Sequence, residues 1–280
     1  QHHALDAAGS QTLLLMPAWD GVHSLGVKLV TVFAGNPQAG LPAVNACYVL
    51  FDARSGAVRA TLDGNELTLR RTGAASALAS RFLSRPDSRR LLMVGSGALA
   101  PHLIRHHCAV RPITEVRIWG RTAANAQRLA RQLSDDRIDV QPCEDLRGAV
   151  QWADIISCAT LSRQPLIQGA WLAPGQHLDL VGAFNAQMSE ADSDAVRRSQ
   201  LFVDTRAGAL ADAGEIIQAL ASGVIPASHL LADLEDLTRG RHRGRTEASA
   251  ITLFKSVGHA LEDLAAAQLV AAGGAHPRAE

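Results

Sequence analysis

The chain has 280 residues, which is enough for one large or two modest domains with a sizeable core. Apolar residues make up 47% and charged residues 19%, a composition that excludes a disordered or fibrous protein. Lys plus Arg and Asp plus Glu are 27 each, so no overall positive charge favours nucleic acid. No apolar run approaches the ~18 residues of a membrane span. We expect a cytoplasmic protein with neither nucleic-acid nor membrane partners.

The N-terminal quarter of the chain is rich in short apolar runs separated by turn residues. A DARSG turn at 52–56 predicts a hairpin between two of these runs. We expect the first run to stop at Pro17, because proline lacks the N–H that a strand interior uses. The pattern predicts an antiparallel β layer. Its apolar runs lie at 12–16, 27–33, 43–51 and 57–62.

From Thr72 onward the pattern changes to alternating helices and strands. A helix that begins there is closed by Pro86. Strands and helices that alternate at this length predict a parallel sheet with helices on both faces. The expected strands lie at 91–94, 115–119, 155–158, 178–182 and 201–203, and the expected helices at 98–109, 122–133, 209–222 and 251–270.

The glycine turn after the strand at 91–94 is the strongest local motif. Gly95-Ser96-Gly97-Ala98-Leu99-Ala100 reads G-x-G-x-x-A, follows a strand and opens a helix. The first glycine permits the tight turn, the second lets a pyrophosphate approach, and the small last residue lets helix pack on strand. Helix N-terminal amides then face the phosphates. We predict dinucleotide binding by this turn; the alternative is a purely structural βα turn.

The end of the next strand bears on the choice of cofactor. A site for NAD usually carries an acidic residue about 20 residues after the glycines. Gly120 stands there instead, followed by Arg121 and Thr122. An arginine can pair with a 2′-phosphate, so we favour NADP(H) over NAD. Alternatively, Arg121 only caps the entry to the following helix.

Two cations of the β layer are candidates for a substrate site. Arg supplies 25 of the 27 basic residues, so the rare Lys28 in an apolar strand suggests a task that a guanidinium cannot perform. Arg71, where the β layer meets the first helix, could clamp a carboxylate bidentately. Lys28 could assist it or move a proton. The alternatives are a lysine that snorkels from a sheet edge and an ordinary exposed arginine.

Other polar residues carry weaker signals. Lys255, the second lysine, precedes Ser256 in a segment that we expect to open a helix, where these groups could either reach a ligand or cap the helix. His102, His106 and His107 are close in sequence, but no carboxylate or cysteine cluster accompanies them. We expect these histidines on the surface, and no metal site.

Nine segments between residues 12 and 270 form a recognisable series. They are MPAWD (16–20), GVKLVTVFAGN (26–36), LDGNELTLRRTGAASALA (62–79), VGSGALA (94–100), VRIWGRT (116–122), ATLSRQP (159–165), HLDLVGA (177–183), VDTRAGAL (203–210) and TLFKSVGHALEDLAAA (252–267). In this order they resemble the ornithine cyclodeaminase/μ-crystallin family.

The resemblance implies an α/β fold in which a Rossmann-type doubly wound parallel sheet domain is inserted into an α+β substrate and dimerisation domain. We expect residues 1–88 plus 246–280 to form the substrate and dimerisation domain, and 89–245 the NADP-binding domain. The family also implies a homodimer and a small imino-acid or amino-acid substrate.

Site residues can be carried over from the family position by position. Lys28 matches the catalytic, substrate-site lysine and Arg71 the arginine that binds the substrate carboxylate, with Asn45 and Phe184 also near the substrate. A further arginine usually precedes the MPA segment, and residues 1–15 contain none. The cofactor positions match Thr72, Gly95, Ser96, Gly97, Ala98, Arg121, Thr122, Thr160, Leu161, Val181, Gly182 and Ser256.

Phe184 separates the branches of the family. Ornithine cyclodeaminases and the related alanine dehydrogenases carry a catalytic Asp two residues after the glycine of the VG motif, where this chain has Phe184. A phenyl ring neither takes nor gives a proton. Together with Arg121, Phe184 makes the chain resemble the ketimine reductase branch. The amino-acid segments are most similar to those of bacterial Δ1-pyrroline-2-carboxylate reductases.

The resemblance therefore implies an NADPH-dependent reductase that converts Δ1-pyrroline-2-carboxylate or Δ1-piperideine-2-carboxylate to L-proline or L-pipecolate by hydride transfer to the C=N carbon. The alternatives are an NAD-dependent ornithine cyclodeaminase, which forms L-proline and ammonia, and an amino-acid dehydrogenase that acts on pyruvate plus an amine. A third alternative is a non-catalytic, NADPH-dependent binding protein of the μ-crystallin type.

Overall fold

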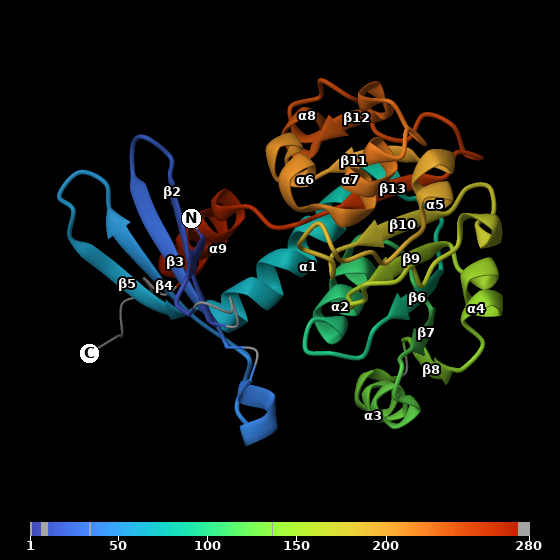
Figure 1. Cartoon of the computed structure of the whole chain (residues 1–280), viewed down its shortest axis with the longest axis horizontal. Coiled ribbons are helices and arrows are strands. Elements are labelled where there is room, and N and C mark those ends of the chain that lie inside the picture. The colour runs from blue at the N-terminus through green and yellow to red at the C-terminus, as the bar shows by residue number, and fades with distance from the viewer. Residues whose placement is uncertain (1, 7–10, 34, 136, 274–280) are drawn as a thin grey trace. The chain divides into compact units, whose positions relative to one another are not determined.

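The computed structural model describes residues 2–6, 11–33, 35–135 and 137–273. Its contacts divide the chain into two compact units. We call residues 1–71 plus 259–280 the terminal unit and residues 72–258 the central unit. Each unit has its own sheet (Figure 1). The central unit thus interrupts the terminal unit in sequence.

The terminal unit is built on an antiparallel sheet of five strands in sequence order. One helix, α9, packs on this sheet, mainly against β2 and β3. Tyr48, Leu50, Leu67 and Leu264 form the centre of its core. The elements are β1 (His2–Ala4), β2 (Gln11–Trp19), β3 (Ser24–Phe33), β4 (Val44–Asp52), β5 (Val58–Asp63) and α9 (Ala260–Gly273), with helix α1 (Gly64–Leu83) following β5.

Strand β2 does not stop at Pro17, so the expectation of a short run there is wrong. The strand continues to Trp19, with Pro17 opposite Val27 of β3. Strand β1 pairs only with residues 12–14 of β2. Among the described residues Pro17 therefore has a paired strand on one side only, where its missing N–H is tolerated.

The central unit confirms the expected Rossmann-type fold. All eight strands of its sheet are parallel, in the order β12-β11-β13-β10-β9-β6-β7-β8. The strands are β6 (Arg90–Val94), β7 (Glu115–Trp119), β8 (Asp139–Cys143), β9 (Ile155–Cys158), β10 (His177–Leu180), β11 (Gln200–Val203), β12 (Leu230–Asp233) and β13 (Thr252–Lys255).

Helices cover both faces of this sheet, and successive side chains of a strand point alternately to one face and to the other. In β6, Leu92 and Val94 join the cluster under α4, α5, α6 and α7, while Leu91 and Met93 pack toward α2 and α3. The helices are α2 (Ala100–Val110), α3 (Ala123–Leu133), α4 (Leu146–Trp152), α5 (Ser193–Arg198), α6 (Arg206–Asp212), α7 (Gly214–Ala221) and α8 (Leu234–Thr238). Both faces are therefore buried, as a parallel sheet requires.

Strand β13 corrects the prediction of a helix over 251–270. Residues Thr252–Lys255 form a fully buried strand between β10 and β11, and the helix α9 begins only at Ala260. The periodicity of a short apolar run of four residues cannot distinguish a buried strand from a segment of buried helix. Because β13 belongs to the parallel sheet, the central unit extends to Gly258, beyond the boundary expected at 245/246, and it begins at Thr72 rather than at residue 89.

Candidate functional site

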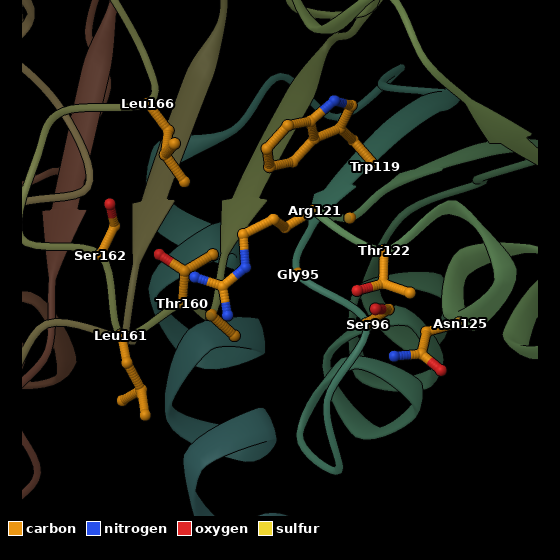
Figure 2. Close-up of a pocket in the computed structure, with 12 residues that line it drawn as sticks. Gly95, Ser96, Trp119, Arg121, Thr122, Asn125, Thr160, Leu161, Ser162 and Leu166 are labelled. Atoms are coloured by element: carbon orange, nitrogen blue, oxygen red, sulfur yellow. The ribbon is translucent and has the colours of Figure 1, made fainter.

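A cleft of about 310 Å³ lies at the carboxyl ends of three strands of the central sheet (Figure 2). From β6 the chain proceeds to β7 and β8 on one side, and then to β9 and β10 on the other. The cleft is therefore at the point where the strand order reverses, which is where open α/β sheets bind ligands. Its lining residues are Gly95, Ser96, Trp119, Gly120, Arg121, Thr122, Asn125, Ala159, Thr160, Leu161, Ser162 and Leu166.

The glycine turn has the geometry that a dinucleotide requires. Gly95 has φ +118, and a Cβ there would lie 2.6 Å from the carbonyl oxygen of Ala159. A Cβ on Gly97, by contrast, would meet no atom within 4 Å, so the backbone there is open to a ligand. In the first turn of α2 the amides of Ala100 and His102 already donate to the carbonyls of Gly97 and Leu99, and Pro101 has no N–H. The donors that the described structure offers to a phosphate are therefore the amides of the glycine turn itself, residues 96–99. These features fit a bound nicotinamide dinucleotide.

Arg121 is an exposed cation on the wall of this cleft. In the described part of the chain it makes no hydrogen bond or ion pair, so it is available to an anion of the ligand. Figure 2 shows its side chain extending across the cleft, with Ser96, Thr122 and Asn125 on the other side in that view. The role of a helix cap for Arg121 is not seen, and Thr122 occupies the N-cap position of α3.

The cofactor positions carried over from the family divide into two groups. Two of those that do not line the cleft are held by other contacts. Ser256 Oγ donates to Asp204 Oδ2 at 3.0 Å, and the N–H of Gly182 donates to Glu190 Oε2 at 2.7 Å. The lining group is Gly95, Ser96, Arg121, Thr122, Thr160 and Leu161, and the other group is Thr72, Gly97, Ala98, Val181, Gly182 and Ser256.

A second cluster, in the terminal unit, brings Lys28 and Arg71 to the same buried carboxylate. Lys28 is on the inward-facing register of β3 and is 2% exposed, and Arg71 on α1 is 9% exposed. The Lys28 Nζ lies 2.8 and 3.0 Å from the two oxygens of Asp263. Arg71 Nε donates to Asp263 Oδ1 at 3.1 Å, and its Nη1 to Glu262 Oε2 at 2.8 Å.

Burial and charge act in opposite directions on this cluster. Burial and the neighbouring Arg71 lower the pKa of Lys28, while Asp263 and Glu262 oppose the shift. Tyr48 pairs with Lys28 across β3 and β4, and burial raises the pKa of its hydroxyl to about 12. Arg71 Nη2 has no partner among the described side chains. The cluster can therefore offer both a buried ammonium and a guanidinium edge to a small anionic ligand.

The other two predicted substrate residues are Asn45, in the terminal unit, and Phe184, in the central unit. Asn45 is exposed on β4, three positions from Tyr48, and so faces the opposite side of the sheet from the Tyr48–Lys28 pair. Its side-chain amide donates to the carbonyl of Pro42 at 3.5 Å. Phe184 follows β10 in the central unit and is 50% exposed.

Sequence reasoning missed both acidic partners of the cation pair. Glu262 and Asp263 lie in the first turn of α9, where acidic residues are ordinary companions of the helix dipole. That pattern alone predicts an exposed helix start. The signal that could have identified Asp263 is the buried lysine itself, which needs a counter-charge.

His107 is also a correction, because it is fully buried rather than on the surface. Its Nε2 lies 3.1 Å from Asp179 Oδ2, which also accepts from Ser157 Oγ at 2.7 Å. Asp179 Oδ1 accepts from Ser76 at 3.0 Å, so this buried network joins α1 and α2 to the sheet. Within the described ranges, no group of three or more His, Cys, Asp or Glu is placed to hold a metal, and no helix is long and apolar enough to cross a membrane.

Comparisons with known proteins agree with these features. Residues 4–273 match the model of the ornithine cyclodeaminase/mu-crystallin family. Protein SAR DEFICIENT 4 of Arabidopsis thaliana is 46% identical over 267 residues, which are 92% of this chain and 82% of that protein. The Delta(1)-pyrroline-2-carboxylate reductase of Paracoccus denitrificans is 43% identical over 261 residues, 93% of this chain and 83% of that protein.

A solved structure supports the same assignment. It is that of Thermococcus litoralis Delta(1)-pyrroline-2-carboxylate reductase in complex with NADH and L-proline. This structure superposes with a TM-score of 0.92 at 34% identity and covers 97% of this chain and 84% of that one. The chain belongs to the ornithine cyclodeaminase/mu-crystallin family and is an NAD(P)-dependent oxidoreductase.

Proposed function

We propose that this protein reduces cyclic imino acids with NADPH, converting Δ1-pyrroline-2-carboxylate or Δ1-piperideine-2-carboxylate to L-proline or L-pipecolate. The observation that carries the proposal is the buried pair of Lys28 and Arg71. A buried guanidinium and ammonium with a shared counter-ion suit a small carboxylate that must be desolvated and oriented. The similarity to reductases of Δ1-pyrroline-2-carboxylate supports this substrate class.

Arg71 binds the substrate carboxylate in this proposal. Its Nε and Nη1 are held by Asp263 and Glu262, so the guanidinium plane is fixed and the Nη2 edge is available for a carboxylate oxygen. Holding the reactant in a fixed orientation can contribute ~7–11 kcal/mol of barrier reduction. A mobile surface arginine would contribute far less, because its own freedom would have to be lost first.

Lys28 keeps the imine nitrogen protonated, directly or through a water molecule. Protonation makes the C=N carbon electrophilic, and the proton remains on nitrogen as the amine forms. The bound NADPH supplies the hydride for that carbon. Asp263 counters the lowering of the Lys28 pKa and so favours the ammonium form that this role requires.

The choice of NADPH over NADH rests on Arg121. It is an exposed cation of the cleft that pairs with none of the described side chains, and the position that carries an acidic residue in NAD sites is Gly120. A guanidinium can form two parallel hydrogen bonds with a 2′-phosphate. Because Gly120 carries no carboxylate, no negative charge at that position repels the 2′-phosphate.

The choice of reductase over cyclodeaminase rests on Phe184. An ornithine cyclodeaminase needs a group that moves protons as ammonia leaves, and an apolar ring cannot provide it. We assign Phe184 to an apolar wall against the substrate ring.

We further propose a homodimer formed through the terminal unit, whose strands and turns expose the apolar side chains of Trp19, Val22 and Val58. Light scattering on the purified protein tests this proposal by measuring the mass of the particle in solution.

Two assays run in parallel test the proposed reaction. The first follows loss of NADPH absorbance with Δ1-pyrroline-2-carboxylate, and the second follows ammonia release from L-ornithine with NAD⁺. We expect NADPH consumption and no ammonia. Ammonia and proline formed from ornithine would refute the assignment of Phe184, and NADPH binding without turnover of either substrate would favour a binding protein.

A further inference from the structure

Three ionisable side chains are buried behind the cofactor cleft, in the central unit. Glu190, Glu215 and Lys255 are 0%, 2% and 0% exposed. Glu190 lies between β10 and α5, Glu215 in the first turn of α7, and Lys255 at the carboxyl end of β13. Buried charges at such a density are costly unless each is paired and hydrogen-bonded. None of the three has a role in the reaction proposed above.

Glu190 uses both of its carboxylate oxygens to hold two loops. Its Oε1 accepts from the N–H and the hydroxyl of Thr160, at 2.7 and 2.8 Å. Its Oε2 accepts from the N–H of Gly182 at 2.7 Å and of Ala183 at 3.2 Å. Thr160 follows β9, and Gly182 and Ala183 follow β10. One side chain therefore ties together the carboxyl ends of two adjacent strands.

The other two members of the cluster hold Glu190 in place. Glu215 Oε1 accepts from the backbone N–H of Glu190 at 2.7 Å. Lys255 Nζ donates to the carbonyl of Ala183 at 2.6 Å and lies 3.3 Å from Glu215 Oε2 and 4.0 Å from Glu190 Oε2. Burial raises the pKa of Glu190, and Lys255 opposes that shift. Lys255 is thus a counter-ion shared by the two glutamates, and it favours the carboxylate form of Glu190.

The two loops are in close contact, so the position of one sets the position of the other. A Cβ on Gly182 would lie 2.1 Å from the Thr160 nitrogen and 2.5 Å from Glu190 Oε1. Glycine is required there because the backbones and the carboxylate fill the space. Thr160 and its neighbour Leu161 line the cofactor cleft. The buried cluster therefore reaches the cleft through Thr160.

The position of these loops indicates which half of the cofactor they serve. A dinucleotide fold has two mononucleotide halves, one on each side of the point where the strand order reverses. The glycine turn after β6 and Arg121 after β7 belong to the half that holds the pyrophosphate and the adenosine ribose. Strands β9 and β10 lie on the other side of that point, which is the nicotinamide half.

We propose that Glu190, held by Lys255 and Glu215, is a positioning residue that fixes the loops after β9 and β10 for the nicotinamide half of the cofactor. This inference rests on the cofactor and not on the substrate or on the choice between NADPH and NADH. A carboxylate is needed because all four contacts of Glu190 are donated to it. In Glu190→Gln the amide NH₂ would face either Thr160 or the N–H groups of Gly182 and Ala183.

The test compares a whole cofactor with the same molecule lacking nicotinamide. Calorimetric titration measures the affinity of Glu190→Gln for NADPH and for ADP-ribose 2′-phosphate, with NADH and ADP-ribose in parallel. We expect the affinity for the whole cofactor to fall about tenfold, while the affinity for the fragment stays that of the unchanged chain. KM for the cofactor should rise more than kcat falls.

Asp154→Asn is the matched control. Asp154 is a buried carboxylate of the same sheet that accepts from two backbone N–H groups, those of Arg89 and Arg90, at 2.9 and 3.0 Å. It precedes β9 and so lies at the amino ends of the strands, whereas the cleft lies at their carboxyl ends. We expect this variant to lose stability while its affinities for cofactor and fragment remain unchanged.

Three outcomes would overturn the proposal: an unchanged NADPH affinity in Glu190→Gln, an equal loss for cofactor and fragment, or the same selective loss in Asp154→Asn. If Glu190→Gln does not fold, Thr160→Val and Thr160→Ser decide. The valine variant lacks the hydroxyl that donates to Glu190, and the serine variant retains it. We expect Thr160→Val to lose NADPH affinity selectively and Thr160→Ser to keep the affinity of the unchanged chain. Equal NADPH affinities in the two variants would overturn the proposal.

Discussion

Replacement of Lys28 by methionine separates the contribution of its charge to stability from its contribution to the reaction. The two side chains have similar length, so packing changes little, but one of the two counter-ions of Asp263 is lost, the other being Arg71. In the described structure Asp263 Oδ2 lies 2.8 Å from Lys28 Nζ, its ion-pair partner, and accepts no hydrogen bond. Arg71 would remain bound only to Oδ1. Lys28→Met therefore leaves one oxygen of a fully buried carboxylate without a partner.

Removing one partner of a buried ion pair costs about 3–5 kcal/mol of unfolding free energy, and because Arg71 still pairs with Asp263 we expect the lower end of that range. The double variant Lys28→Met/Asp263→Asn has a neutral amide in place of that carboxylate, so it should recover part of the loss. Catalysis should respond differently. We expect kcat to fall about 10²–10⁴-fold in Lys28→Met, the range for loss of a general acid, and not to recover in the double variant.

The assays are urea unfolding, steady-state reduction of Δ1-pyrroline-2-carboxylate and calorimetric titration of NADPH, each on wild type and the three variants, with Asp263→Asn as the third. NADPH affinity should be unchanged in Lys28→Met. A double variant no more stable than Lys28→Met would refute the electrostatic reasoning. A Lys28→Met enzyme that retains its kcat would refute the assigned role of Lys28.

Three further predictions concern the central unit. Arg121→Ala should weaken NADPH binding about tenfold or more and NADH binding far less; equal losses, measured as KM for each cofactor, would contradict the assignment. Gly95→Ala should abolish binding of both cofactors in calorimetric titration, because its Cβ would lie 2.6 Å from the Ala159 carbonyl at φ +118; retained binding would show that the turn can adjust. Burial lowers the pKa of His177 from 6.5 to about 3, so its neutral form contributes stability above pH 6.5 that is lost as the pH falls toward 3. Between neutral pH and about pH 4.5 the unfolding free energy falls by about 2.5 kcal/mol on this account. Urea unfolding at the two pH values should show a correspondingly smaller fall in His177→Asn; an equal fall in both proteins would contradict the shift.

The features that sequence predicted well are those that depend on near neighbours in the chain. The glycine turn, the strand before it and the helix after it lie within about twenty residues, and the structure places Gly95, Ser96 and Arg121 around one cleft. Alternating strands and helices likewise predicted the parallel sheet. Burial of Lys28 was also foreseeable, because it lies within an apolar strand.

The features that sequence did not predict depend on distant partners. Asp263 is 235 positions from Lys28, and in α9 it looks like any acidic residue at a helix start. Strand β13 was read as helix because four residues carry too little periodicity; it is a strand because β10 and β11 offer it hydrogen bonds on both sides. Glu190 lies in a loop and acquires its role only through Thr160 and Lys255.

Deuterium transfer tests the central claim most directly. The enzyme is given Δ1-pyrroline-2-carboxylate and NADPH that is deuterated at the transferred position of nicotinamide C4, and the proline formed is analysed by mass spectrometry and NMR. The account predicts L-proline with one deuterium on Cα. Proline without deuterium on Cα, or no proline at all, would contradict hydride transfer to the C=N carbon.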